Sequence, residues 1–271
     1  MSHTKKIAIL GCGWLGFPLA KVLIANNYKV NGSTTSQEKL LLLSENKINS
    51  YLIALSENEI LGNIDVFLEN IEVLIIDIPP KLRGIIKENF IAKIENLISF
   101  IEKSGIKKVI FVSSTSVYND ENKTVTETDI LNPETESGRQ LLQTENLLLN
   151  NIYFKSTILR FGGLIGEDRN PIKMLAGREN IANPDAAINF IHQEDCIDII
   201  VKIIENKTFN NEIYNAVAPF HPTRINYYTK KALEYNLEVP KFNDDNPSVG
   251  KTVSSEKLIN DLKYNFKNID F

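Results

Sequence analysis

Three glycines near the N-terminus have the spacing of a phosphate-binding loop. The apolar run Ile7–Leu10 is followed by Gly11-x-Gly13-x-x-Gly16 and then by a helical pattern. The first glycine of such a loop permits a tight turn, the second lets the backbone approach a pyrophosphate, and the third allows the helix to pack closely on the strand. Exposed N–H groups and the positive end of the helix dipole then hold the phosphates.

This loop predicts that the chain binds a dinucleotide of the NAD(P) type. The glycine spacing alone is a weak signal, but its place in the first strand–helix unit of an alternating chain strengthens it. The predicted cofactor contacts in the loop are Gly11, Gly13, Trp14, Leu15 and Gly16.

The end of the second predicted strand bears on the choice between NAD and NADP. Proteins that bind NAD usually place Asp or Glu about 20 residues after the loop, to accept from the ribose hydroxyls. This chain has no acidic residue between Phe17 and Gln37, and its second strand leads into Ser33-Thr34-Thr35-Ser36 with Lys39 beyond. Hydroxyls and a cation suit a 2′-phosphate, although Ser and Thr are also favoured as helix N-caps. We therefore predict contacts from Ser33, Thr34 and Thr35, and a preference for NADP(H) over NAD(H).

Further hydroxyls gather where the fifth predicted strand ends, in Ser113-Ser114-Thr115-Ser116-Val117-Tyr118. At this point the chain resembles the NAD-dependent epimerase/dehydratase family, the extended short-chain dehydrogenase/reductases. In that family a strand ending in Ser-Ser-x-x-Val-Tyr carries the catalytic Ser or Thr. The resemblance implies that Ser114 donates a hydrogen bond to the reacting oxygen. The alternative is that these hydroxyls only satisfy the strand end.

The resemblance continues in the same order along nearly the whole chain. It includes Ile158-Leu159-Arg160 with Gly163 and Gly166, Asn189-Phe190-Ile191-His192-x-x-Asp195, Ile213-Tyr214-Asn215, and Ser254-Ser255-x-Lys257-Leu258 with Leu262. It implies an oxidoreductase or epimerase-like enzyme whose small-molecule substrate is a nucleotide sugar. The remaining predicted site residues are Pro79 and Ser113 for the cofactor, and Thr115, Arg139 and His192 for the substrate.

One segment departs from the family. The family needs Tyr-x-x-x-Lys on the helix after the fifth strand, because the Lys ammonium lowers the pKa of the phenol so that Tyr can exchange a proton near neutral pH. Here Ser137 stands in the Tyr position and Leu141 in the Lys position, and no shift in register restores the pair. The Tyr227-x-x-x-Lys231 sequence lies far along the chain, and we interpret it as chance. No other group is an obvious base.

This departure resembles an atypical branch of the extended family, the YeeZ-like proteins. They share Trp-Leu-Gly-x-Pro-Leu-Ala, found here from Trp14 to Ala20, the Ser-Ser-Thr-Ser-Val-Tyr segment, and Ser137-Gly138-Arg139 in place of the active Tyr segment. The glycine loop followed by Pro-Leu-Ala is also similar to β-hydroxyacid dehydrogenases. Those proteins continue into a large all-helical domain, which the strand-like segments near Ile188 and Tyr214 argue against.

Short apolar runs that alternate with amphipathic segments must position these residues. Continuous Val/Ile/Leu runs predict strands buried on both faces, and strand–helix alternation predicts a parallel sheet. We expect an α/β fold, a doubly wound Rossmann sheet over residues 1–165, and a small mixed α/β lobe over 166–271, part of which returns to the core sheet. Predicted strands cover 6–10, 28–33, 50–54, 72–78, 107–113, 153–160, 187–191 and 213–217; predicted helices cover 14–26, 37–45, 85–103, 138–149, 193–205, 224–235 and 254–262.

Composition narrows the class of protein. The 271 residues carry a formal charge of −4 without a block of like charge, so neither nucleic acid nor an anionic membrane is an expected partner. The two cysteines, Cys12 and Cys196, lack metal-ligand spacing and predict neither a disulfide framework nor a metal site. The first apolar run is too short for a signal peptide or a membrane span, so we expect a cytoplasmic protein.

Three functions fit these residues. The first is an NAD(P)-dependent oxidoreductase or epimerase-like enzyme that works without the Tyr/Lys pair. The second is a protein that senses NADP(H) or acts as a scaffold without turnover. The third is a β-hydroxyacid dehydrogenase-like enzyme. A homodimer through a helix pair at the core's edge, as in many relatives, is left open by the sequence.

Overall fold

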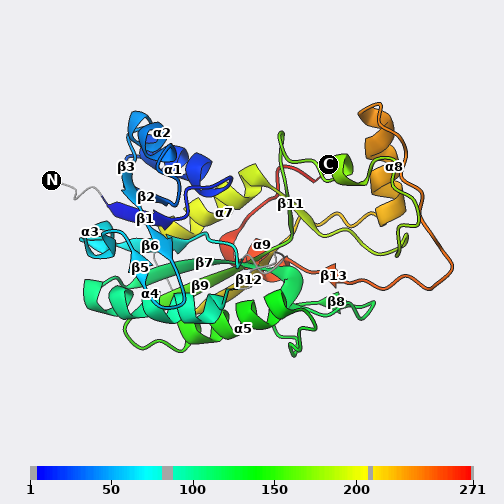
Figure 1. The fold of residues 1–271 in the computed structure, drawn as a ribbon. Helices are drawn as coiled ribbons and strands as arrows, with labels where there is room; N and C mark the ends of the chain where they lie inside the picture. The colour runs from blue at the N-terminus through cyan, green and yellow to red at the C-terminus, as the bar shows by residue number, and fades with distance from the viewer. Residues whose placement is uncertain (1–4, 81–87, 207–209, 270–271) are drawn as a thin grey trace. The chain divides into compact units, whose positions relative to one another are not determined.

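The computed structural model describes residues 5–80, 88–206 and 210–269, and Figure 1 shows its ribbon. The chain divides into two compact units built from separated segments. The first comprises Met1–Val117, Pro133–Arg160 and Ile197–Ile213; the second comprises Tyr118–Asn132, Phe161–Cys196 and Tyr214–Phe271. The boundary predicted after residue 165 falls within a segment of the second unit, and Ile197–Ile213, beyond it, belongs to the first.

A seven-stranded sheet with the order β12-β9-β7-β6-β1-β2-β3 organises the first unit. β1 pairs in parallel with β2 and β6, β2 with β3, and β6 with β7. The predicted α/β class with a parallel sheet is confirmed. The strand order reverses at β1, and the loop after β1 therefore stands at the point where doubly wound sheets bind ligands. The strands are β1 (Lys6–Leu10), β2 (Lys29–Thr34), β3 (Asn49–Leu52), β6 (Val73–Ile76), β7 (Lys108–Ser114), β9 (Lys155–Phe161) and β12 (Glu212–Ala216).

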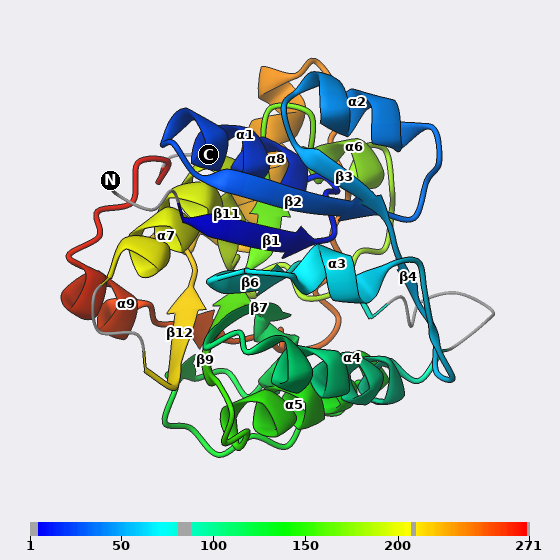
Figure 2. The ribbon, with the colours of Figure 1, turned by 90° about the vertical axis from the view of Figure 1, so that its left-hand side faces the viewer.

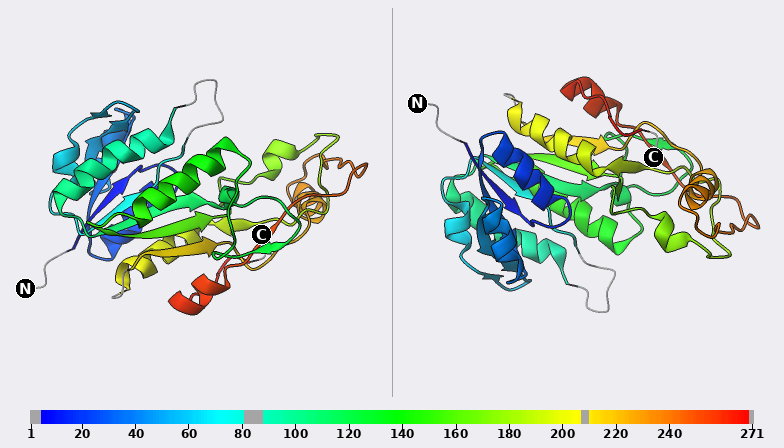
Figure 3. Two further views of the ribbon diagram at one scale, coloured as in Figure 1. Left: turned by 90° about the horizontal axis from the view of Figure 1, so that it is seen from below. Right: turned by 90° about the horizontal axis from the view of Figure 1, so that it is seen from above.

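Helices cover both faces of this sheet, as Figures 2 and 3 show. Helices α1 (Gly16–Ala25) and α7 (Gln193–Glu205) lie on one face, and α4 (Phe90–Ser104) and α5 (Glu136–Leu149) lie on the other. The first unit also holds α2 (Lys39–Glu45), α3 (Ile64–Leu68), the antiparallel pair β4 (Ala54–Leu55) and β5 (Ile60–Leu61), and the short 3₁₀ helix η1 (Thr115–Val117).

Side-chain caps set the ends of the two helices behind the candidate catalytic strand. The Asn89 side chain accepts from the Ala92 amide where α4 begins, and the Thr135 hydroxyl accepts from the Gly138 amide where α5 begins. The helix predicted over residues 85–103 therefore begins at Phe90 among the described residues, and positions 85–87 lie outside them. The predicted strand over residues 50–54 is divided between β3 and β4.

The second unit is a smaller mixture of short strands and helices. Its strands form two parallel pairs, β10 (Gly163–Ile165) with β11 (Phe190–His192) and β13 (Thr252–Val253) with β8 (Thr124–Val125). Its helices are α6 (Ile172–Leu175), α8 (Arg224–Glu234) and α9 (Glu256–Leu262). These strands contrast with the all-helical domain of the β-hydroxyacid dehydrogenase alternative.

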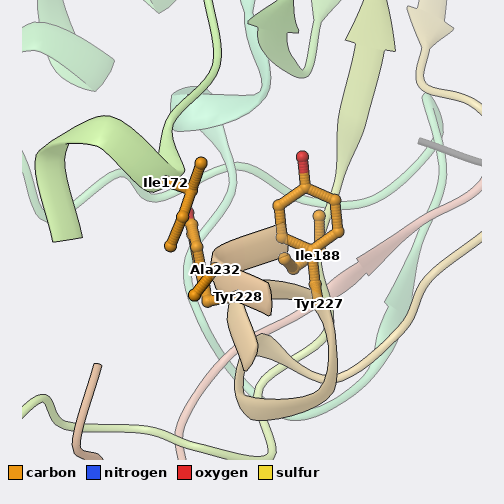
Figure 4. Close-up of a cluster of buried hydrophobic side chains, with 5 residues drawn as sticks. All are labelled: Ile172, Ile188, Tyr227, Tyr228 and Ala232. Carbon is orange, nitrogen blue, oxygen red and sulfur yellow. The ribbon is translucent and has the colours of Figure 1, made fainter. Parts of the chain in front are cut away.

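A buried cluster fixes α8 within this unit. Tyr227, Tyr228 and Ala232 of α8 pack with Ile172 of α6 and with Ile188, as Figure 4 shows. The Tyr227 and Tyr228 rings meet edge to face with centroids 5.1 Å apart.

Among the described residues, no helix has both the length and the apolar character needed to cross a membrane.

Candidate functional site

The glycines of the loop after β1 differ in their surroundings. Gly11 has a φ of 110°, and a Cβ there would lie 2.2 Å from the carbonyl oxygen of Asp77. A Cβ on Gly16 would lie 2.2 Å from the carbonyl oxygen of Gly11. A Cβ on Gly13 would meet nothing within 4 Å. Gly11 and Gly16 are therefore required by the packing of the loop, whereas Gly13 leaves open space beside the start of α1.

A cavity of about 370 Å³ opens at this loop. It brings together six of the predicted cofactor contacts: Gly11, Gly13, Ser33, Thr34, Thr35 and Pro79. Lys39, the cation that follows the hydroxyls in the sequence, also lines the cavity. Other lining residues include Cys12, Asp77, Phe90 and Lys93, which were not predicted to lie there. Leu15 and Gly16 are buried, and Leu15, Gly16, Trp14 and Ser113 are not among the residues that line the cavity.

The hydroxyls at the end of β2 support the loop. The Ser33 hydroxyl accepts from the Gly11 amide at 2.9 Å, and the Thr34 hydroxyl accepts from the Ser36 amide at 3.1 Å. Lys39 of α2 lines the same cavity, and the only carboxylate among the lining residues that the structure describes is Asp77. The cavity wall thus includes hydroxyls and a cation.

Asp77 directly follows β6 and is the least expected member of the cavity wall. Its carboxyl accepts a hydrogen bond from the Gly16 amide, and burial raises its pKa to about 7 against the opposing effect of that bond. Burial and the nearby Asp77 charge also raise the pKa of the Cys12 thiol to about 12, so this cysteine is a neutral, unreactive thiol at physiological pH.

The second predicted centre, at the end of β7, contains a buried polar network. The Ser113 hydroxyl donates to Glu145 Oε1 at 2.5 Å, and Arg160 Nη2 donates to Glu145 Oε2 at 2.6 Å. Glu145 and Arg160 are 0% and 1% exposed, so two charges are held together inside the protein. The Ser113 hydroxyl therefore has a structural role, because its hydrogen bond to Glu145 connects the end of β7 to α5.

Ser114 and Thr115 continue this strand end. The Ser114 hydroxyl accepts from the Ser116 amide at 3.1 Å, a local bond that satisfies the backbone. A hydroxyl that accepts one bond still has its own hydrogen to donate, so this bond is compatible with the predicted role. Thr115 is buried in η1.

On the face of α5 where the family carries Tyr and Lys, the Tyr position is half-buried and the Lys position is buried. Leu141 is 3% exposed, and Ser137 lies one turn earlier. Arg139 is turned to its own helix end: its Nη2 donates to Glu136 at 3.0 Å and its Nη1 to the Glu134 carbonyl at 2.6 Å. This arrangement supplies no ammonium at the Lys position.

The other sequence candidates belong to the second unit. His192 Nδ1 accepts from the Glu194 amide at 3.3 Å, so the neutral ring carries its proton on Nε2.

Tyr227 and Lys231 also belong to this unit. Burial raises the pKa of Tyr227, whereas an activated phenol needs a lowered pKa. Lys231 Nζ donates to Glu234 Oε2 at 2.6 Å. With its ring in the buried cluster of Figure 4, Tyr227 is a core residue of the second unit. His192, Tyr227 and Lys231 also line a polar cavity within this unit.

Known proteins are similar to this chain in sequence and in fold. The model of the NAD dependent epimerase/dehydratase family matches residues 83–216. Protein YeeZ of Escherichia coli (strain K12) is 34% identical over 265 residues, which cover 97% of this chain and 96% of that protein. A putative NAD-dependent epimerase/dehydratase from Methylobacillus flagellatus superimposes with a TM-score of 0.79 at 23% identity, over 99% of this chain and 95% of that one. A UDP-glucuronic acid 4-epimerase from Bacillus cereus in complex with NAD gives a TM-score of 0.79 at 18% identity, over 97% and 92%.

Proposed function

The chain belongs to the NAD-dependent epimerase/dehydratase family, and from this premise we propose that it binds a nicotinamide dinucleotide in the cavity at the loop Gly11–Gly16. The observation that carries the proposal is the open space at Gly13, beside the amide groups that begin α1. Backbone N–H groups at a helix N-terminus bind phosphates, and a residue without a Cβ lets them approach. The lining hydroxyls and Pro79 would hold the adenosine side of the cofactor.

Within this function we propose a preference for NADP(H). Ser33, Thr34, Thr35 and Lys39 line the cavity, and the segment after β2 carries no carboxylate that could accept from the ribose 2′-hydroxyl or repel a phosphate there. NADPH should bind more tightly than NADH, and Lys39→Ala should weaken NADPH binding while leaving NADH binding nearly unchanged. Equal weakening of both cofactors by Lys39→Ala would contradict the preference.

We further propose a slow oxidoreductase or epimerase-like reaction on a nucleotide sugar. When bound, the nicotinamide supplies hydride transfer. The Ser114 hydroxyl would donate a hydrogen bond to the reacting oxygen of the substrate. The chain lacks the family's Tyr and Lys at Ser137 and Leu141, and general acid–base catalysis contributes about 10²- to 10⁴-fold, so turnover should be slow. Nucleotide sugars are suggested by the UDP-glucose and NAD bound to MoeE5, whose fold this chain shares with a TM-score of 0.79.

A non-catalytic role as a dinucleotide sensor is the second candidate. It is favoured by the burial of Leu141 and by the local bonds of Arg139, which leave α5 without a cation at the Lys position. The two candidates share the cofactor site and differ only in turnover.

Fluorescence titration with NADPH and NADH tests the shared site. Gly13→Ala should abolish binding while the protein stays folded, because its Cβ would enter only the open space that the pyrophosphate needs. Unchanged affinity in Gly13→Ala would place the cofactor elsewhere.

NADPH oxidation across a panel of nucleotide sugars and small carbonyls then separates the two candidates. Turnover that Ser114→Ala abolishes supports the enzyme, whereas tight binding without turnover on any substrate supports the sensor.

A further inference from the structure

Asp77 places a carboxyl at the point where a dinucleotide needs positive charge. The Asp77 amide donates to the Leu10 carbonyl at 2.9 Å, which holds the residue beside the loop after β1. Its carboxyl accepts from the amide of Gly16, the first residue of α1. The N-cap residue of α1, Leu15, has no side-chain bond of this kind. Asp77 therefore caps α1 from the end of the neighbouring strand β6, and its carboxyl lies at the helix end that would hold a pyrophosphate.

Few other charges of the described residues face this carboxyl. From the loop itself comes Cys12, a neutral thiol because its pKa is raised to about 12. From α2 and α4 come Lys39 and Lys93, which line the same cavity, and Lys93 is paired with Glu88. Burial dominates the pKa of Asp77 and raises it to about 7, so the free protein holds a mixture of acid and carboxylate at neutral pH.

A pyrophosphate beside an ionised Asp77 would bring like charges together in a cavity where water screens them poorly. The neutral acid removes this repulsion and adds an O–H that can donate to a phosphate oxygen. We propose that Asp77 is a cofactor-binding residue that acts as the neutral acid, so that each dinucleotide binds together with one proton. The proton comes from solvent and joins a carboxylate oxygen, and no other bond changes. This inference rests on the proposed dinucleotide site.

The expected consequence is an affinity that falls as the pH rises. If only the acid form binds, the dissociation constant grows as the acid form is depleted, by about 30-fold between pH 6 and pH 8.5 for a pKa of about 7. NADH is the probe for this titration, because its pyrophosphate keeps its charge over this range, whereas a phosphate monoester such as the 2′-phosphate of NADPH titrates near pH ~6. Asp77→Asn should bind NADH with little dependence on pH. Asp65→Asn, a change at an exposed carboxylate of α3, should follow the wild type.

Calorimetry of the unchanged protein provides a second readout. In buffers of different ionisation enthalpy, NADH binding should take up about 0.9 proton at pH 8 and about 0.1 at pH 6. Absence of proton uptake would overturn the proposal even where Asp77→Asn does not fold.

The outcomes separate the two proposals. Binding that is independent of pH and free of proton uptake would overturn the role of Asp77 and leave the dinucleotide site intact. Absence of NADH and NADPH binding from pH 6 to 8.5 would overturn the dinucleotide site itself. A steep decline in affinity that persists in Asp77→Asn would assign the proton to another group.

Discussion

At the scale of single residues, the loop glycines should respond differently to the same substitution. A methyl group on Gly11 meets the Asp77 carbonyl oxygen, and the φ of 110° is one that L-residues rarely adopt. Gly11→Ala should therefore lower the free energy of unfolding by roughly 2–5 kcal/mol, through backbone strain and overpacking. Gly13→Ala should melt within about 2 °C of the wild type, because its Cβ meets no atom within 4 Å. Thermal denaturation of both variants measures the contrast, and equal losses would show that Gly13 is also needed for folding.

Asp77 also predicts how the stability of the protein without cofactor depends on pH. Its pKa in the folded state is about 7, raised from an ordinary 3.8 by burial, so the folded state binds the proton more tightly than the unfolded chain does. The stabilisation this gives is complete below pH 3.8 and is lost as the pH rises toward 7. Asp77→Asn has no such titration. The melting temperature of Asp77→Asn minus that of the wild type should therefore increase between pH 4.5 and pH 7 and stay constant at higher pH. Parallel melting curves at all pH values would contradict the raised pKa.

Single residues also show where reasoning from sequence ends. The glycine loop, the hydroxyls after β2 and the missing Tyr/Lys pair follow from spacing and residue type alone. The part played by Asp77 does not, because its bond joins the residue after β6 to the first residue of α1, and β6 lies beside β1 only in the folded sheet. Ser113 was predicted as a cofactor contact. Its side chain bonds Glu145, 32 positions away on α5, and the sequence gives no sign of that contact.

At the scale of secondary structure, α5 explains why the family's catalytic pair cannot simply be restored. Position 141 lies on the buried face of the helix. Leu141→Lys would place an ammonium there while the carboxylate one turn along, Glu145, is already held by Arg160 and Ser113, and should lower the free energy of unfolding by roughly 3–5 kcal/mol. Gln143→Lys, at an exposed position of the same helix, should change it by less than about 0.5 kcal/mol. Urea denaturation measures both values. A Leu141→Lys variant as stable as the wild type would show that this face can accept the family's Lys.

Long elements were predictable and very short ones were not. β1 and α7 have the predicted bounds, since a continuous apolar run and a long amphipathic period are local signals. The five-residue helix α3 was missed because it is too short to show a period. The pair β8–β13 was missed because it joins residues 124–125 to 252–253, and the local sequence of neither segment indicates its distant partner.

At the scale of the whole molecule, the chain order and the spatial units do not coincide. The first unit needs Ile197–Ile213, which carries most of α7 and the start of β12, although it lies beyond residue 165. Figure 2 shows α7 covering one face of the sheet. The buried apolar residues of α7 in this segment are Ile197, Ile199, Ile200, Ile203 and Ile204. Each buried aliphatic side chain contributes about 1.5–3 kcal/mol of transfer free energy, so the loss of this helix removes a large share of a marginal stability.

A fragment of residues 1–165 should therefore fail to fold, although it contains the complete dinucleotide loop. It would expose the sheet face that α7 covers, and its β8 would lack β13. We expect aggregation on size exclusion, no cooperative thermal transition by circular dichroism, and no NADH binding, with the full chain as the control. A fragment that melts cooperatively and binds NADH would show that the predicted boundary marks an independent domain. Failure of the fragment would mean that the cofactor loop depends on a helix encoded about 180 residues after it, so that truncation is the wrong way to isolate the site.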